Sequence, residues 1–190
     1  MKSIAVFASG TGTNFEAIQK AIEDHQLDAS IECVVSDHRD AKVVEKARQK
    51  NIEVFAFDPK SYPSKKDYEK EIVTLLDSKK VDLVVLAGYM RLCGEVLLNA
   101  YEGKIINIHP SLLPAFKGKD AIGQAIDYGV KVMGVTIHYV DSGMDSGKII
   151  AQKCFDVEEG LSREEIEASI HAIEHVLYPS VIQKLLEEMK

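Results

Sequence analysis

The stretch SIAVFASGTGTN at residues 3–14 passes from a run of apolar residues into a glycine-rich turn. Its first half predicts a buried strand, because it is short, apolar and ends directly at the turn. Gly10 and Gly12 allow the chain to turn tightly. Thr13 and Glu16 have the spacing of a capping box, which predicts that a helix begins at Thr13. Such a strand–turn–helix unit is typical of an α/β sheet.

The alternation of strand and helix continues along the chain as far as residue 109. Further short runs rich in Val and Ile are predicted strands, at residues 31–36, 52–57, 82–87 and 104–109. Stretches with apolar residues at three- and four-residue spacing are predicted helices, at residues 13–25, 40–50 and 64–80. This order favours an α/β fold with a single doubly wound, mostly parallel sheet, Rossmann-like, with helices on both faces.

A different order of elements follows. The predicted elements are a helix near 118–128, strands at 132–140 and 148–156, and a long amphipathic helix at 162–189. The connection 141–147 is short enough to make its two flanking strands antiparallel neighbours. Pro179 predicts a bend in the C-terminal helix. No change of composition marks a linker, so we expect a single domain over residues 1–190.

Composition indicates an ordinary globular chain of 190 residues, of which 46% are hydrophobic and 28% charged. A net charge of -7 and the lack of a dense Lys/Arg run argue against a nucleic-acid partner. The apolar runs are too short for a membrane span or a secretion signal. The 3 cysteines are widely spaced, which argues against disulfides and a zinc site and favours a cytoplasmic location.

Ligands of open α/β sheets bind beyond the carboxyl ends of the strands, where the strand order reverses. The turn 9–14 lies at the first strand end, and the N–H groups of the following helix start suit a phosphate. The turn is neither a dinucleotide fingerprint, which would need glycine at Phe15, nor a P-loop. A tight structural turn is the alternative. Arg91, after the fourth strand, is either an anion ligand or an ordinary surface cation.

The fifth strand ends in NIHP at residues 107–110. The two-residue period of a strand directs Asn107 and His109 to the same side. Two polar side chains where a buried face would hold Val or Leu indicate a ligand site, and the alternative is a polar pair that holds a loop. Asp145, flanked by glycines two residues away on either side, is either a turn residue or a functional carboxylate.

An amide, an imidazole and a carboxylate together suit acyl transfer to an amine. Asn107 can donate an N–H to the oxyanion, His109 can stabilise the same charge, and Asp145 can relay protons. Hydrolysis at a metal held by His109, His138 and Asp145 is an alternative, but this spacing matches no metal motif, so no metal is expected.

Several motifs resemble, in order and spacing over essentially the whole chain, those of the folate-dependent formyltransferase superfamily. They are SGTGTN at 9–14, LAGYMR at 86–91, NIHPSLLP at 107–114 and DSG at 145–147. The string Asn-x-His-Pro-Ser-Leu-Leu-Pro, followed later by Asp145, is the most specific of them. The resemblance is greatest to the enzymes of purine biosynthesis that transfer the formyl group of 10-formyltetrahydrofolate to the amine of glycinamide ribonucleotide.

The resemblance implies a role for each motif. The catalytic residues would be Asn107, His109 and Asp145. The phosphate and ribose of glycinamide ribonucleotide would be bound by Gly12, Thr13, Asn14 and Glu174. The reduced folate, a co-substrate, would be bound by Met90, Arg91, Leu92, Val140 and Asp141, with Arg91 near its glutamate end. The ribonucleotide-binding part would cover about 1–100 and the catalytic and folate-binding part about 84–160, in a monomer or a homodimer.

Other members of the superfamily fit less well. Methionyl-tRNA formyltransferase carries a further C-terminal domain and binds an anionic tRNA, and formyltetrahydrofolate hydrolase normally has a further N-terminal domain. Chain length and the net charge of -7 disfavour both. A non-catalytic nucleotide-binding module is the alternative from a different class. Ser146 stands where glycine commonly follows the catalytic aspartate, so the loop must relax if this position needs a positive φ.

Overall fold

The computed structural model describes residues 1–189. The strands are β1 (Lys2–Phe7), β2 (Ala29–Ser36), β3 (Glu53–Ala56), β4 (Leu83–Leu86), β5 (Ile105–His109), β6 (Val132–Tyr139) and β7 (Ile149–Asp156). The helices are α1 (Thr13–Glu23), α2 (Lys42–Gln49), α3 (Lys65–Ser78), α4 (Glu95–Ala100), α5 (Ala121–Tyr128) and α6 (Arg163–Glu188), with a short 3-10 helix η1 (Pro59–Ser61). Each predicted strand and helix is present, with ends that differ by a few residues.

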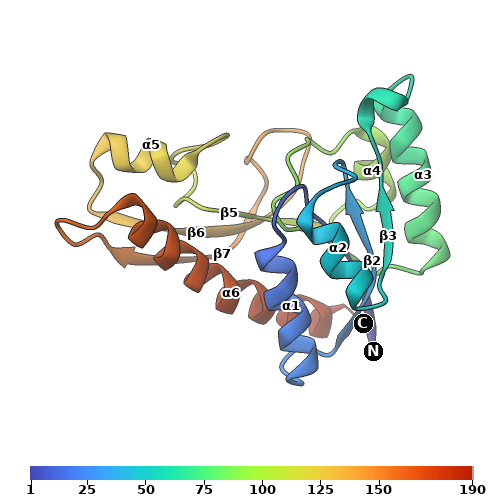
Figure 1. The fold of residues 1–190 in the computed structure, drawn as a ribbon, viewed down its shortest axis with the longest axis horizontal. Coiled ribbons are helices and arrows are strands. Elements are labelled where there is room, and N and C mark those ends of the chain that lie inside the picture. The colour runs from blue at the N-terminus through green and yellow to red at the C-terminus, as the bar shows by residue number, and fades with distance from the viewer. Residues whose placement is uncertain (190) are drawn as a thin grey trace.

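One mixed sheet of seven strands organises the molecule, in the order β3-β2-β1-β4-β5-β6-β7 (Figure 1). The pairs from β3 to β5 are parallel, whereas β6 runs antiparallel to both β5 and β7. The doubly wound, mostly parallel sheet with an antiparallel C-terminal pair is therefore confirmed. The strand order reverses between the neighbours β1 and β4, so the ends of these strands mark the expected ligand site.

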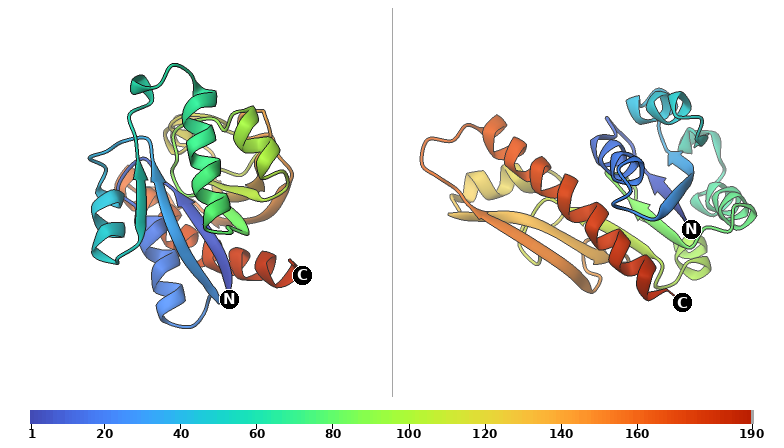
Figure 2. Two further views of the ribbon diagram at one scale, coloured as in Figure 1. Left: turned by 90° about the vertical axis from the view of Figure 1, so that its right-hand side faces the viewer. Right: turned by 90° about the horizontal axis from the view of Figure 1, so that it is seen from below.

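Alternate residues of the parallel strands pack against helices on opposite faces of the sheet. Ile4 and Val6 of β1 belong to an apolar cluster that includes residues of α1, α2 and α6. Ala5 and Phe7 belong to a second cluster with residues of α3 and α4. Figure 2 shows α6 running along β5, β6 and β7. Because both faces are covered, the strands read in sequence as continuous apolar runs.

Helix α6 begins with a capping box formed by Ser162 and Glu165, each of whose side chains accepts a hydrogen bond from the backbone N–H of the other. The helix continues through Pro179, where a bend was expected. Tyr178 and Ile182 beside this proline are fully buried, so packing against the sheet stabilises the helix on both sides of the missing N–H.

The Tyr178 hydroxyl ties α6 to the sheet, because it donates to the main-chain oxygens of Leu86 (2.7 Å) and Ile106 (3.3 Å). We expect Tyr178→Phe to lower the free energy of unfolding by about 1–3 kcal/mol, since two buried carbonyls lose a donor. Urea unfolding of variant and wild type measures the difference. Tyr128→Phe is the matched control, because Tyr128 is 80% exposed. If Tyr178→Phe and Tyr128→Phe were equally stable, the hydroxyl would have no structural role.

Two local features differ from the sequence-based expectation. Helix α4 is not predicted, because its six residues are too few to display a helical period. The predicted capping box at Thr13 is wrong: the N-cap of α1 is Gly12, at φ 77°, and no side chain caps the helix. Glu16 instead forms an ion pair with Lys46 of α2, at 2.8 Å between Oε2 and Nζ.

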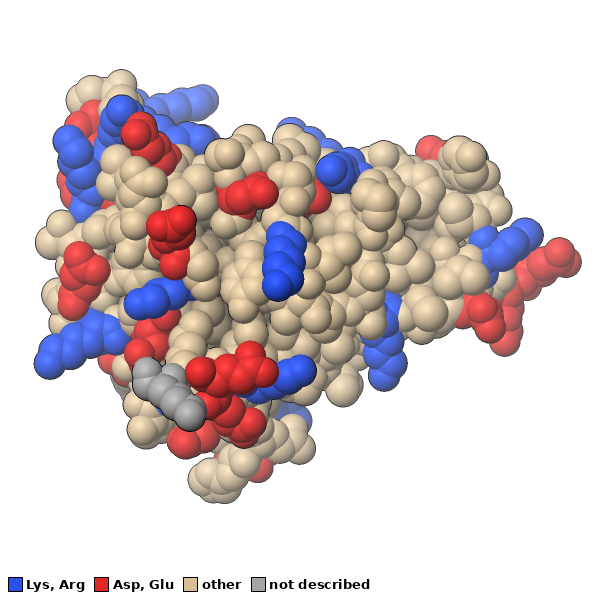
Figure 3. All heavy atoms as spheres, turned by 180° about the vertical axis from the view of Figure 1, so that it is seen from behind, with Lys and Arg blue, Asp and Glu red and all other residues tan. Residues whose placement is uncertain are grey.

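Charged side chains of both signs lie on the face shown in Figure 3, where several Lys and Arg side chains gather at the upper left with Asp and Glu among them. Within residues 1–189, no helix has the length and apolar character needed to cross a membrane.

Candidate active site

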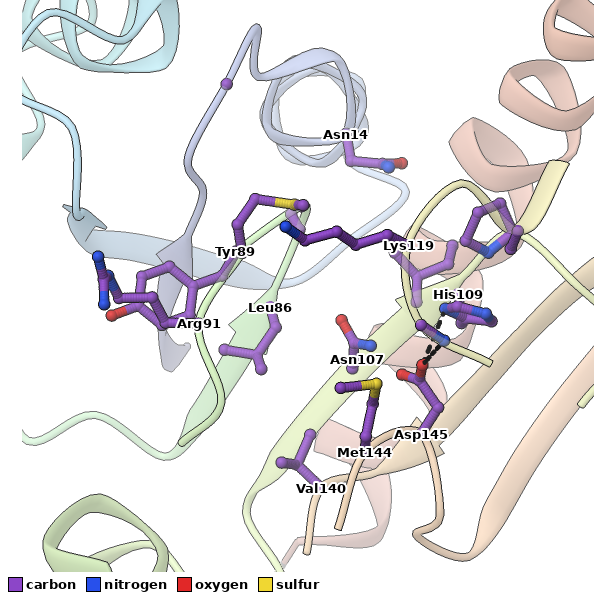
Figure 4. Close-up of a pocket in the computed structure, with 18 of the residues that line it drawn as sticks. Asn14, Leu86, Tyr89, Arg91, Asn107, His109, Lys119, Val140, Met144 and Asp145 are labelled. Atoms are coloured by element: carbon purple, nitrogen blue, oxygen red, sulfur yellow. Dashed lines mark hydrogen bonds and ion pairs between the residues drawn. The ribbon is translucent and has the colours of Figure 1, made fainter. Parts of the chain in front are cut away.

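A cleft of about 500 Å³ opens at the carboxyl ends of β1, β4 and β5, beside the point where the strand order reverses (Figure 4). Every site residue that the sequence predicts lines this cleft: Gly12, Thr13, Asn14, Met90, Arg91, Leu92, Asn107, His109, Val140, Asp141, Asp145 and Glu174. Side chains that are distant along the chain therefore meet in one compartment.

Asn107 and His109 reach the cleft from β5, as the strand period predicts, while Ile106 and Ile108 pack into the core cluster with α1 and α6. His109 is buried, and its Nε2 lies 2.8 Å from the main-chain oxygen of Phe116. Because a carbonyl can only accept, Nε2 carries a hydrogen and donates it there. The other ring nitrogen of His109, Nδ1, faces Asp145 at 3.5 Å from Oδ2.

His138 of β6 orients the Asn107 amide. Its Nδ1 lies 2.8 Å from the main-chain oxygen of Tyr139, so this nitrogen carries a hydrogen and donates it. In the neutral ring Nε2 is then an acceptor, and Asn107 Nδ2 donates to it at 3.3 Å. The second N–H of the same amide nitrogen is left for a ligand. His138 also lies 3.8 Å from Asp145 Oδ1, so it belongs to the site directly.

Asp145 lies in the loop between β6 and β7 with only 12% of its side chain exposed. Its Oδ2 accepts a hydrogen bond from the Gly118 N–H at 2.9 Å. The positive φ of this loop, 50°, falls on Asp145 itself and not on Ser146, so the serine in place of glycine is not strained in this way. Aspartate is among the residues that tolerate this conformation.

The loop that carries Asp145 is braced by Asp141. Asp141 Oδ1 accepts from the Gly143 N–H at 2.9 Å and from the Ser146 hydroxyl at 2.7 Å. The Ser146 hydrogen bond, with that of Gly143, lowers the pKa of Asp141, because both stabilise the charged carboxylate. Gly147 lies so close to the Tyr139 carbonyl that a Cβ would collide with it. This glycine therefore lets the loop pack back on the end of β6.

The turn after β1 has the form of an anion site at the start of α1. Gly12 takes a left-handed conformation, and a Cβ there would lie 2.7 Å from Val43 Cγ2. Glycine is therefore required both for φ and for the close approach of α2. Thr13 and Asn14 are the first helical residues, where main-chain N–H groups lack partners within the helix.

Glu174 of α6 faces this turn and is buried. Its Oε2 accepts from Asn14 Nδ2 at 3.2 Å and lies 3.1 Å from His171 Nδ1. The hydrogen bond to Glu174 raises the pKa of His171. Asn14 Oδ1 is buried and has no hydrogen-bond partner within residues 1–189. A buried acceptor without a donor is costly, so this edge of the cleft is suited to a ligand hydroxyl.

The opposite side of the cleft is apolar and open. Met90, Leu92 and Met144 are exposed by 63%, 49% and 51%. They lie on the loops that follow β4 and β6, and Figure 4 shows Val140 near Met144. Exposed apolar side chains gathered in a cleft suit a flat apolar ligand.

Three further residues of this region are not among the catalytic and binding residues predicted from the sequence. From the sequence, His138 is only an alternative metal ligand, and its hydrogen bond with Asn107 could have been inferred only from the pairing of β5 with β6. Lys119 lines the cleft, and Figure 4 shows its side chain extending into it. Asp37, at the end of β2, pairs with Arg91. Neither Lys119 nor Asp37 belongs to a motif that spacing could reveal.

His109, His138 and Asp145 are the residues that the alternative of a metal-dependent hydrolase would need as ligands. Among the described residues 1–189, no three His, Cys, Asp or Glu side chains are grouped so that they could hold a metal ion. His109 Nε2 and His138 Nδ1 donate to main-chain oxygens, so each ring keeps one nitrogen for the cleft, and those two face Asp145. This arrangement suits proton transfer between the three groups.

The fold and the site together define an α/β enzyme of the acyl-transferring class. Comparison with known proteins identifies its family. The model of the formyl transferase family matches residues 2–182. The chain therefore belongs to the formyl transferase family.

Relatives of known name agree with this assignment. The chain is 56% identical over 186 residues to a phosphoribosylglycinamide formyltransferase of Bacillus subtilis, covering 98% of this chain and 95% of the relative. A crystal structure of phosphoribosylglycinamide formyltransferase from Bacillus halodurans superposes with a TM-score of 0.95 at 54% identity, over 100% of this chain and 97% of that one. Glycinamide ribonucleotide transformylase 1 from Geobacillus kaustophilus gives the same TM-score of 0.95 and 54% identity, over 98% and 99%.

Proposed function

We propose that this enzyme transfers the formyl group of 10-formyltetrahydrofolate to the amine of glycinamide ribonucleotide, giving formylglycinamide ribonucleotide and tetrahydrofolate. The observation that carries the proposal is the meeting of Asn107, His109 and Asp145 in one cleft, between an anion-binding turn and an apolar wall. The names of the relatives support the choice of substrates.

The reaction forms a carbon–nitrogen bond to the formyl carbon and breaks the bond from that carbon to the folate nitrogen. Negative charge develops on the formyl oxygen, where the free N–H of Asn107 and the His109 ring can stabilise it. The attacking amine loses a proton and the leaving nitrogen gains one. Asp145 is the group that accepts and returns this proton, directly or through water. No side chain needs to be acylated.

The ribonucleotide fits the turn after β1. Its phosphate would accept from the main-chain N–H groups of Gly12, Thr13 and Asn14, where the helix dipole of α1 also favours an anion. Glu174 would accept from the ribose hydroxyls, and the unpartnered Asn14 Oδ1 could accept from one of them. In this orientation the glycine amine extends from the ribose toward Asn107 and Asp145.

The folate fits the apolar side of the cleft. Met90, Leu92 and Val140 would cover its ring system, and main-chain groups near Asp141 would take its polar edge. Arg91 would lie near the glutamate end. The folate supplies the formyl group. The ribonucleotide-binding part would cover about residues 1–100 and the folate-binding part about 84–160, so the two parts overlap at the loop after β4.

The setting of the reaction is part of the same proposal. We expect a cytoplasmic enzyme without nucleic-acid or membrane partners, acting as a monomer or homodimer and without a metal. The cysteines are all free: Cys33 and Cys93 are buried and Cys154 is exposed. Burial raises the pKa of the Cys33 and Cys93 thiols to about 12, so both stay protonated and unreactive at neutral pH.

A three-component assay tests the reaction. Protein, 10-formyltetrahydrofolate and glycinamide ribonucleotide are mixed, and deformylation of the folate is followed by its absorbance. Turnover should require the ribonucleotide. Turnover in its absence would indicate a formyltetrahydrofolate hydrolase, and no turnover in any mixture would indicate a nucleotide-binding module.

We expect Glu174→Gln to raise the KM for glycinamide ribonucleotide by about 10-fold or more, since a charged acceptor is replaced by a neutral one at a site with little water. The KM for 10-formyltetrahydrofolate should stay unchanged, because Glu174 faces the turn after β1 and not the apolar wall. Steady-state kinetics with each substrate varied in turn measures both constants. An unchanged KM for the ribonucleotide would remove Glu174 from the ribose site.

A further inference from the structure

Asp37 is a buried carboxylate that the proposed mechanism does not use. It directly follows β2, and its side chain is only 2% exposed. Oδ2 accepts from Arg91 Nε at 3.0 Å, and Oδ1 accepts from the Ser9 hydroxyl and lies 3.0 Å from His38 Nδ1. A carboxylate buried this deeply is stable only where charged and hydrogen-bonding partners replace water.

These contacts connect Asp37 to the loop after β4 by two routes. The direct route is the ion pair with Arg91. The second route passes through Ser9, whose hydroxyl oxygen accepts from the Met90 N–H at 2.9 Å while its hydrogen goes to Asp37. The Ser9 N–H also donates to the Gly88 oxygen at 3.0 Å. Through its own contacts and those of Ser9, Asp37 thus reaches three positions of this loop, 88, 90 and 91.

The loop that Asp37 reaches is the one that carries the exposed apolar side chains Met90 and Leu92. The Arg91 side chain is 39% exposed, and Figure 4 shows it beside Tyr89, away from Asn107 and Asp145. A partly exposed arginine has many accessible rotamers unless a partner restrains it. Ordering such groups before a ligand arrives lowers the entropy cost of binding.

Beyond Ser9, which contacts Asp37, the turn after β1 is held by residues of α2. The Gly10 oxygen accepts from the Val43 N–H at 3.1 Å, and the Thr11 oxygen accepts from Lys46 Nζ at 2.7 Å. Both partners belong to α2. The proposed phosphate site therefore does not depend on the ion pair between Asp37 and Arg91, although it lies on the same side of the sheet.

We propose that Asp37 is a positioning residue for the formyl donor, because it restrains Arg91 and, through Ser9, the Met90 backbone before the folate binds. This inference rests on the proposed function. It predicts a selective effect, in which loss of the Asp37 charge weakens binding of the folate and leaves the ribonucleotide site and the chemical step intact.

The test is a pair of kinetic titrations on Asp37→Asn, a change that keeps the size of the side chain and removes its charge. The KM for 10-formyltetrahydrofolate should rise by about 10-fold, the loss typical of a charge-assisted hydrogen bond. The KM for glycinamide ribonucleotide and kcat should change by less than about twofold. Asp40→Asn is the matched control, since Asp40 is exposed three residues along the chain, and it should change none of these constants.

A double-variant cycle separates the restraint of Arg91 from a general loss of stability. Arg91→Met should also raise the KM for the folate, and adding Asp37→Asn to it should raise that KM little further. Ser9→Ala should raise the same KM by the second route while keeping the ion pair. Ser9→Ala and Arg91→Met also keep the inference testable if Asp37→Asn does not fold.

The outcomes are distinct. Wild-type protein without ribonucleotide-dependent turnover would refute the proposed function itself. Wild-type turnover with an unchanged folate KM in Asp37→Asn would overturn the role of Asp37 alone. Equal increases in both KM values, or full additivity of Asp37→Asn with Arg91→Met, would also overturn it, since either result would mean that Asp37 supports only the fold.

Discussion

Asp145→Asn should lower kcat by about 10²–10⁴-fold, the range for loss of a positioned general acid–base group. The amide cannot take up the proton that the attacking amine must lose. It can still accept the Gly118 N–H and adopt the φ of 50° found at this position, because asparagine tolerates the left-handed conformation. Folding and both KM values should therefore be close to those of the wild type.

Stopped-flow and steady-state assays of the Asp145 variant, with thermal unfolding as a check on the fold, measure this effect. Asp127→Asn on α5 is the matched control, because Asp127 is exposed and does not line the cleft. A kcat near the wild-type value in Asp145→Asn would assign the proton relay to another group. The nearest ones are His109 at 3.5 Å and His138 at 3.8 Å.

Asn107→Ala is expected to reduce kcat by about 10²–10³-fold, as found when one oxyanion donor is removed. The amide is oriented before the substrate arrives, since one N–H donates to His138 Nε2 at 3.3 Å and the other is left for the ligand. Alanine removes this donor, so that His109 is the only one of the two side chains left to stabilise the oxyanion. Because the charge develops only in the transition state, both KM values should change little.

The control for Asn107→Ala is Asn99→Ala, on the exposed side of α4. This variant should keep the wild-type kcat. A wild-type kcat in Asn107→Ala would exclude the amide from the mechanism. A large rise in KM with unchanged kcat would mean that Asn107 binds the substrate in its ground state and does not stabilise the charge that forms later.

Much of the fold follows from patterns that operate over a few neighbouring residues. In β1, Ile4 and Val6 pack on one face and Ala5 and Phe7 on the other, so a strand buried on both sides is visible as an uninterrupted apolar run. The placing of Asn107 and His109 on one side of β5 follows from the two-residue period. The apolar run of β1 and the two-residue period of β5 are local properties, because they depend only on residues that are neighbours along the chain.

The start of α1 shows where local patterns become unreliable. Thr13 and Glu16 have capping-box spacing, yet Glu16 pairs with Lys46 of α2, which is 30 residues away. A side chain with two possible partners takes the one that packing brings near, and the sequence does not contain that distance. The same reason explains α4, whose six residues are stabilised by burial of Leu97 and not by a helical period.

The amino-acid sequence by itself therefore determined the order of strands and helices. It also contained the motifs whose resemblance to a known family indicated Asn107, His109 and Asp145. Their arrangement depends on contacts across the sheet: His138 meets Asn107 because β5 and β6 pair, and Asp37 meets Arg91 because β2 and β4 flank β1. Such contacts join residues far apart along the chain. These contacts form only when the apolar strands and helices pack together. Packing buries polar groups, and each buried polar group then needs a hydrogen-bonding or charged partner.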